Sequence, residues 1–268
     1  LTITLEGTNT IAEVGKGIYV LASSTGEATL TITSESGGSL DASGSINPGI
    51  WVQSNSGNAT LTIQDAEVEA TVTSAAGHGV TVQAGSSSSA SLAVEGGSLT
   101  ATGGRSSGLG IYFYGPSSSE NINLTVSNNA IVRANRGIAS GADEDEAVST
   151  DGVGIVFNDN QGTVYGDVTL QDNLEIGEGE SLNIPSGAGL EIPGGKTLTN
   201  AGTVTNSGTL TNNGTINNSG TLPSNIAGNP PPSITTTALA DGTVGTAYSA
   251  TLAASGNPTS WNITGSLP

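Results

Sequence analysis

Short segments in which apolar and polar residues alternate recur in fixed order along the first two-thirds of the chain. They form three series. The first reads Leu1-Thr2-Ile3, Leu30-Thr31-Ile32, Leu61-Thr62-Ile63, Leu92-Ala93-Val94, Leu124-Thr125-Val126 and Val168-Thr169-Leu170. The second is anchored by Ile11, Leu40, Val68, Leu99, Ile131 and Leu174. The third reads Gly17-Ile18-Tyr19-Val20, Gly49-Ile50-Trp51-Val52, Gly79-Val80-Thr81-Val82, Gly110-Ile111-Tyr112-Phe113 and Gly154-Ile155-Val156-Phe157. Alternation of this kind predicts strands with one buried face.

The spacing of these series predicts how the strands are arranged. Each repeats after about thirty residues, and the first two lengthen together at their last step, so one insertion between Ile131 and Gly154 explains both. Asn-Gly hairpin signals are absent from this region. Coiling the chain stacks each strand on its equivalent in the previous coil and joins the apolar residues into one core. Parallel crossovers are right-handed. We therefore expect an all-β fold, a right-handed parallel β-helix with three strands per coil, over residues 1–173.

A shorter period begins at Leu174. Apolar residues recur every eight positions up to Leu198 and then every six up to Leu222. The six-residue unit repeats asparagine and glycine, at Asn200, Asn206, Asn212, Asn218, Gly202, Gly208, Gly214 and Gly220. We expect residues 174–228 to continue as a tighter solenoid. Its asparagines can hydrogen-bond along the corners of the stack or bind sugar, and the corner role is the simpler explanation.

The repeat stops at Asn229-Pro230-Pro231-Pro232, which predicts an extended linker. The segment Gly242-Thr243-Val244-Gly245-Thr246-Ala247-Tyr248-Ser249, the strand around Trp261 and the closing Leu267-Pro268 resemble the bacterial putative immunoglobulin-like repeat. A complete sandwich needs about 100 residues, so residues 229–268 match an incomplete module. The repeats of residues 1–228 resemble bacterial cell-surface β-helices, including carbohydrate-binding ones. Together these resemblances imply an exported protein displayed at the bacterial cell surface on immunoglobulin-like spacers.

The charge of the chain limits its partners. Asp and Glu total 23 against five Lys and Arg, which gives a formal net charge of −18. Such a surface repels nucleic acid and anionic lipid. No apolar run is long enough to cross a bilayer, so we expect no membrane insertion within this segment. Cysteine is absent, which excludes disulfides and thiolate metal sites.

Catalytic residues are scarce. The single histidine, His78, lies between two glycines and fits a solvated turn, although it could also orient a substrate. Glu67 and Glu69 share a strand face, but no matching carboxylate completes a glycosidase pair. Arg133 and Arg136 precede an acidic run that holds Asp143, Glu144, Asp145, Glu146 and Asp151. The run fits a solvated loop. The alternatives are a calcium site at Asp143, Asp145 and Asp151, and a calcium-dependent polysaccharide lyase. We expect no enzyme activity, with calcium the one candidate cofactor.

The third series contains a candidate binding surface. In Gly-Ile-x-Val the x residue points outward, and the x positions are Tyr19, Trp51, Thr81, Tyr112 and Val156, with Tyr114 also outward. Stacked coils align them in one column. Exposed rings at Tyr19, Trp51, Tyr112 and Tyr114 suit sugar binding, whereas packing under loops is the alternative. We therefore expect an adhesin or glycan-binding protein that contacts a polysaccharide or a host or cell-surface protein. The alternatives are the lyase and a structural spacer without ligand.

Overall fold

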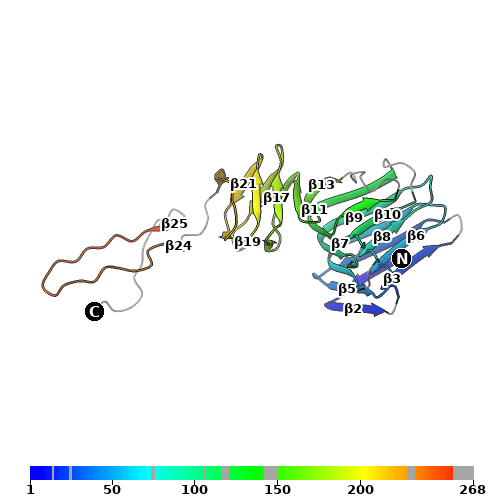
Figure 1. Ribbon diagram of the computed structural model, residues 1–268, viewed down its shortest axis with the longest axis horizontal. Helices are drawn as coiled ribbons and strands as arrows, with labels where there is room; N and C mark the ends of the chain where they lie inside the picture. The colour runs from blue at the N-terminus through cyan, green and yellow to red at the C-terminus, as the bar shows by residue number, and fades with distance from the viewer. Residues whose placement is uncertain are drawn as a thin grey trace.

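The computed structural model describes residues 1–13, 15–23, 26–73, 76–105, 107–115, 121–141, 150–228 and 233–255. Within these ranges the protein is all-β, built of strands joined by turns (Figure 1). No helix in the described part of the chain is long and apolar enough to span a membrane. The strands stack along one axis from the N-terminal coils to about residue 228, and a hairpin follows.

The largest sheet has the order β1-β4-β7-β9-β11-β13-β14-β17-β20, with β2 and β5 attached at one end. Its pairs are parallel except β13 with β14. The strands up to β14 are β1 (Thr2–Leu5), β2 (Thr8–Glu13), β4 (Ala28–Ser34), β5 (Ser39–Gly44), β7 (Ala59–Val72), β9 (Ala90–Thr102), β11 (Ile122–Asn135), β13 (Thr150–Asn158) and β14 (Gln161–Tyr165).

A second parallel sheet has the order β12-β10-β8-β6-β3. Its strands are β3 (Ile18–Ala22), β6 (Ile50–Ser54), β8 (Val80–Gln83), β10 (Ile111–Tyr114) and β12 (Ile138–Ser140). Equivalent residues of successive coils pair in both sheets. Leu61, for example, lies opposite both Leu30 and Leu92. Because alternate residues point to one side, these leucines form a fully buried column in the core. The expected parallel stacking of repeats about thirty residues apart is confirmed.

Two details of the expected coil are wrong. The first two series form separate strands only in the first two coils, and they fuse into continuous β7, β9 and β11 in the next three. Each long strand bends at residues with positive φ, such as Asp65 (49°) and Asn129 (63°), so the backbone turns without leaving the sheet. The register of the second series also shifts. Ile11 lies opposite Ala42 instead of Leu40, and Leu99 lies opposite Val132 instead of Ile131.

The predicted strand positions of the last repeat are wrong. Ile155 pairs with Ile131 in the large sheet, and the second sheet continues with Ile138 in β12 instead. Val168 and Leu174 belong to the shorter coils that follow. The cause is the antiparallel hairpin between β13 and β14, whose two-residue loop is Asp159-Asn160 with Asp159 at a φ of 54°. Asn-Gly is therefore not the only signal for a hairpin in this chain, because Asp also tolerates this conformation.

The short coils place one strand on each of three sheets. The strands are β15 (Asp167–Thr169), β16 (Leu174–Ile176), β17 (Ser181–Ile184), β18 (Gly189–Ile192), β19 (Thr197–Asn200), β20 (Thr203–Asn206), β21 (Thr209–Asn212), β22 (Thr215–Asn218) and β23 (Ile226–Ala227). Their orders are β15-β18-β21-β23 and β16-β19-β22, while β17 and β20 extend the largest sheet. Leu182, Leu190 and Leu198 fill the core.

The asparagines of the short coils hold corners together. Asn200 is fully buried, and its Nδ2 donates to Asn218 Oδ1 at 2.7 Å in the next coil. The Oδ1 atoms of Asn206 and Asn212 each accept the backbone N–H two residues later. These bonds link neighbouring coils and turn amides, and they support a structural role for the repeated asparagine.

The C-terminal hairpin pairs β24 (Ser233–Ile234) with β25 (Ala254–Ser255) in antiparallel fashion. The Tyr248 hydroxyl donates to the carbonyl of Ala240 at 2.8 Å. Trp261 and Leu267-Pro268, which contribute to the resemblance to an immunoglobulin-like repeat, lie outside the described residues.

Candidate functional site

The outward residues of the second sheet form one column. Trp51 lies opposite Tyr19 on one side and Thr81 on the other, and Thr81 lies opposite Tyr112. The next position is Ala139 and not Val156, which is buried in the core with 4% of its surface exposed. Val156 therefore does not belong to the column, because its strand pairs in the other sheet.

Tyr19 and Trp51 form a pair of rings at one end of this column, with ring centroids 5.1 Å apart. The Lys16 ammonium lies 3.3 Å from the Tyr19 ring centroid and 4.5 Å from that of Trp51, a cation–π arrangement. The Tyr19 hydroxyl bonds to Gln53 Oε1 at 2.6 Å. Tyr19 is thus part of a clamp around Lys16 and does not line the cavity beyond Trp51.

That cavity, which we call the aromatic pocket, has a volume of about 310 Å³. It brings together three of the four predicted sugar-binding residues, Trp51, Tyr112 and Tyr114. The size is at the lower end of small-molecule sites. Its lining residues are Ile46, Asn47, Pro48, Trp51, Ala76, Gly77, His78, Thr81, Gln83, Tyr112 and Tyr114.

His78, for which the sequence favours a solvated turn over a role in orienting a substrate, lines the pocket. It is half-buried, and its ring stacks on Tyr112 at a centroid distance of 4.3 Å and an interplanar angle of 11°. Its Nδ1 accepts the Leu109 N–H at 3.1 Å. The expectation of a solvated turn histidine is therefore wrong. Burial lowers the pKa of His78 below its usual 6.5, so the imidazole is neutral at pH 7.

This burial predicts a pH-dependent stability. Because the pKa of His78 is lower in the folded chain, the unfolded chain binds more protons below about pH 6.5. The contribution is fully present above that pH and is lost as the pH falls through the folded-state pKa. We expect the wild type to lose more stability than His78→Gln between about pH 7.5 and about pH 5.5. Thermal unfolding at both pH values measures this, and equal losses in the two proteins would contradict it.

Two polar atoms at the pocket lack partners. Thr81 is 5% exposed, which corrects the expectation that it points into solvent, and its Oγ1 has no hydrogen bond. The indole N–H of Trp51 is likewise buried and unpaired. Leaving a buried polar group unsatisfied costs about 1–3 kcal/mol. Two residues that line the pocket thus carry buried polar atoms that form no hydrogen bond.

Thr81→Val tests this cost. The substitution replaces an unpaired hydroxyl with a methyl group on the same β-branched frame, and we expect a gain of about 1 kcal/mol in the free energy of unfolding. Thr205→Val is the control, since the Thr205 hydroxyl bonds to Asn183 Oδ1 at 2.9 Å and its removal should not stabilise. Urea unfolding compares the two. A destabilised Thr81→Val would show that the hydroxyl has a partner, such as a bound water.

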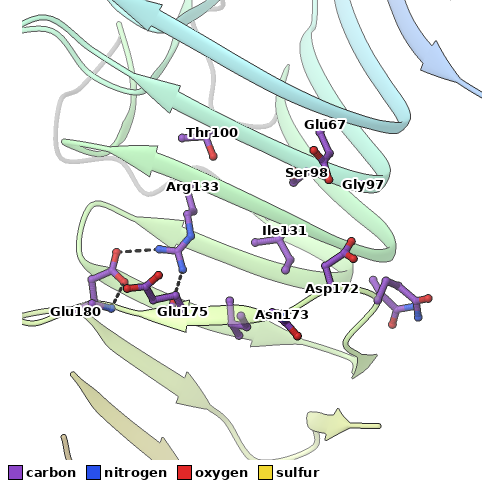
Figure 2. Close-up of a pocket in the computed structure, with 14 residues that line it drawn as sticks. Glu67, Gly97, Ser98, Thr100, Ile131, Arg133, Asp172, Asn173, Glu175 and Glu180 are labelled. Atoms are coloured by element: carbon purple, nitrogen blue, oxygen red, sulfur yellow. Dashed lines mark hydrogen bonds and ion pairs between the residues drawn. The ribbon is translucent and has the colours of Figure 1, made fainter. Parts of the chain in front are cut away.

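A larger hollow, the acidic cleft, lies where the long coils meet the short ones (Figure 2). Its volume is about 590 Å³. The cleft is lined by Glu67, Gly97, Ser98, Thr100, Asn129, Ile131, Arg133, Gln171, Asp172, Asn173, Leu174, Glu175, Gly177 and Glu180. Sequence spacing did not indicate it, because Glu67 and Glu180 are brought together by stacking.

Arg133 is held on several sides in this cleft. Its Nη1 forms an ion pair with Glu180 Oε1 at 2.8 Å, and its Nη2 donates to the carbonyl of Glu175 (Figure 2). Its guanidinium carbon lies 3.8 Å from the Phe157 ring centroid. A lyase base must be free to take a proton from the substrate, whereas this guanidinium is held in an ion pair with Glu180. The cleft geometry favours a structural role for Arg133.

The predicted calcium residues fall largely outside the described structure. Asp143 and Asp145 lie in the undescribed segment 142–149, and Asp151 is placed by its backbone alone, in β13. Among the described residues no cluster of three or more His, Asp or Glu side chains could hold a metal ion.

Comparisons with known proteins do not identify a relative. No family model, curated protein or solved structure matches this chain. The residues of the aromatic pocket are therefore the main indication of function.

Proposed function

We propose that this protein is an extracellular, glycan-binding right-handed β-helix of the bacterial cell surface, which binds sugar in the aromatic pocket. The observation that carries the proposal is the gathering of Trp51, Tyr112 and Tyr114 around one cavity in a chain with only nine Phe, Trp and Tyr residues. Flat rings pack against the C–H faces of sugars, and their polar edges reach hydroxyl groups.

The rest of the chain supports a binding role. The stacked coils form a rigid scaffold, and a site on strands is held more precisely than one on loops. The strongly acidic charge suits a soluble exported surface, and the resemblance of the C-terminal segment to immunoglobulin-like spacers favours display on a cell. A calcium-dependent lyase is less well supported, since Arg133 is tied to Glu180.

Binding assays on three proteins test the proposal. We expect the wild type to bind at least one glycan in a polysaccharide and oligosaccharide screen, and Trp51→Ala/Tyr112→Ala to lose at least about tenfold in affinity through loss of the stacking surface. Tyr248→Ala is the control, because Tyr248 is an exposed aromatic far from the pocket in sequence and 50% exposed. Circular dichroism checks the fold of each variant.

The outcomes separate the alternatives. Binding that survives the double substitution but disappears with a chelator would move the site to the acidic segment around Asp143 and Asp151. Binding of no glycan by any of the proteins would refute the proposal and favour a protein partner or a structural spacer.

A further inference from the structure

The aromatic pocket differs in charge from the rest of the surface. None of the eleven described residues that line it is Asp, Glu, Lys or Arg, although the chain has 23 acids. Four other hollows each contain at least one carboxylate: the acidic cleft and the cavities that include Asp65, Asp41 and Asp159. A ligand in the aromatic pocket therefore meets rings, amides and aliphatic groups.

An anionic group finds no cationic side chain among the described lining residues. Part of its hydration would be lost on entry, and a charge without an opposite charge beside it is costly to desolvate. The cation nearest in sequence to the column, Lys16, lies over the Tyr19 and Trp51 rings and does not line the pocket. The net charge of −18 adds repulsion at longer range, screened beyond about 8 Å at physiological salt.

A neutral sugar finds matching groups. The C–H face of a pyranose can lie on Trp51 or Tyr114. The side-chain amides of Asn47 and Gln83, which line the pocket, can both donate to and accept from hydroxyl groups. His78 has Nδ1 occupied by the Leu109 N–H, so in its neutral form Nε2 carries the proton and donates. These groups recognise hydroxyls without requiring charge.

We infer that the aromatic pocket selects electrically neutral pyranose sugars over sugars that carry a carboxylate or a sulfate. This inference rests on the proposed glycan-binding function and adds the chemical class of the ligand. The discrimination comes from the uncharged lining and from the negative field of the whole chain.

A glycan array that spans neutral, sialylated, uronic-acid and sulfated glycans tests it, probed with the wild type, Trp51→Ala/Tyr112→Ala and Tyr248→Ala. We expect the glycans bound by the wild type and by Tyr248→Ala, but lost in the double variant, to be neutral. Pocket-dependent binding of mainly anionic glycans would overturn the inference and leave the proposed function intact. The absence of any pocket-dependent glycan would overturn both.

A matched pair then measures the size of the effect. The strongest pocket-dependent neutral glycan is compared with the same glycan oxidised at C6 to the uronate, which adds one carboxylate and keeps the ring. We expect the uronate to bind at least about tenfold more weakly, with a penalty that shrinks as salt is added. Equal or tighter binding of the uronate would overturn the inference. Tighter binding that is lost in Lys16→Gln would assign the carboxylate contact to Lys16.

Discussion

Phe113→Ala should lower the free energy of unfolding by about 3–5 kcal/mol, the usual cost of removing a buried aromatic ring. Phe113 lies on β10 with none of its surface exposed, and its neighbours in register are Val82 and Ser140. Since each coil is stabilised largely by its neighbours, a cavity at this level weakens the coils on both sides. Urea unfolding followed by circular dichroism measures the loss.

Tyr114→Ala is the matched control for this prediction. Tyr114 lies two residues after Tyr112 in β10, so both side chains are on the face away from the core. Tyr114 is 49% exposed. A truncation on this face should cost less than about 1 kcal/mol. Similar losses in Phe113→Ala and Tyr114→Ala would contradict the buried position of Phe113.

Gly79→Ala should destabilise the protein by about 2–3 kcal/mol through overpacking. A Cβ at this position would lie 2.6 Å from the Thr102 backbone nitrogen, 2.7 Å from the Ala70 oxygen and 2.8 Å from the Gly110 oxygen. All three are backbone atoms of neighbouring segments, so no side chain can rotate to make room. The coils would have to separate at this corner, which lies next to the aromatic pocket.

Gly194→Ala is the control, because its nearest neighbour would be the Asn213 oxygen at 3.8 Å and its φ lies outside the left-handed region. We expect a change between zero and a gain of about 1 kcal/mol, since alanine reduces the entropy of the unfolded chain. Thermal unfolding compares the two variants. A neutral Gly79→Ala would show that the coils are packed more loosely at this corner than the structure indicates.

The glycine of the Gly-Ile-x-Val repeat illustrates the limit of sequence analysis. The pattern showed that Gly17, Gly49, Gly79 and Gly110 recur, but not why. In the structure each lies against backbone atoms of another coil, as Gly49 does against the Thr71 nitrogen, which would lie 2.8 Å from an ideal Cβ. The constraint is a contact between segments, and such contacts do not appear in local spacing.

The candidate site could likewise be predicted only in part, because local spacing shows which residues share a face but not which side chains meet. Alternation placed Tyr19, Trp51, Thr81 and Tyr112 on one face, and period placed them in one column, which the register confirms. The other residues at the pocket could not be predicted from this pattern. His78 enters the pocket from the loop between β7 and β8, Lys16 lies over the Tyr19 and Trp51 rings, and Thr81 is buried. A repeat pattern in the sequence does not show such side-chain contacts.

The all-β class, the stacking of parallel strands and most of the inward residues can be predicted from the sequence, because a period near thirty and a side-chain alternation of two are properties of the chain alone. Three features are visible only in the folded protein: where the long strands bend, how the hairpin at Asp159 redirects the last repeat, and which aromatic rings share a cavity. Those outcomes depend on backbone conformation at single residues and on packing between coils, where small shifts in register change every neighbour.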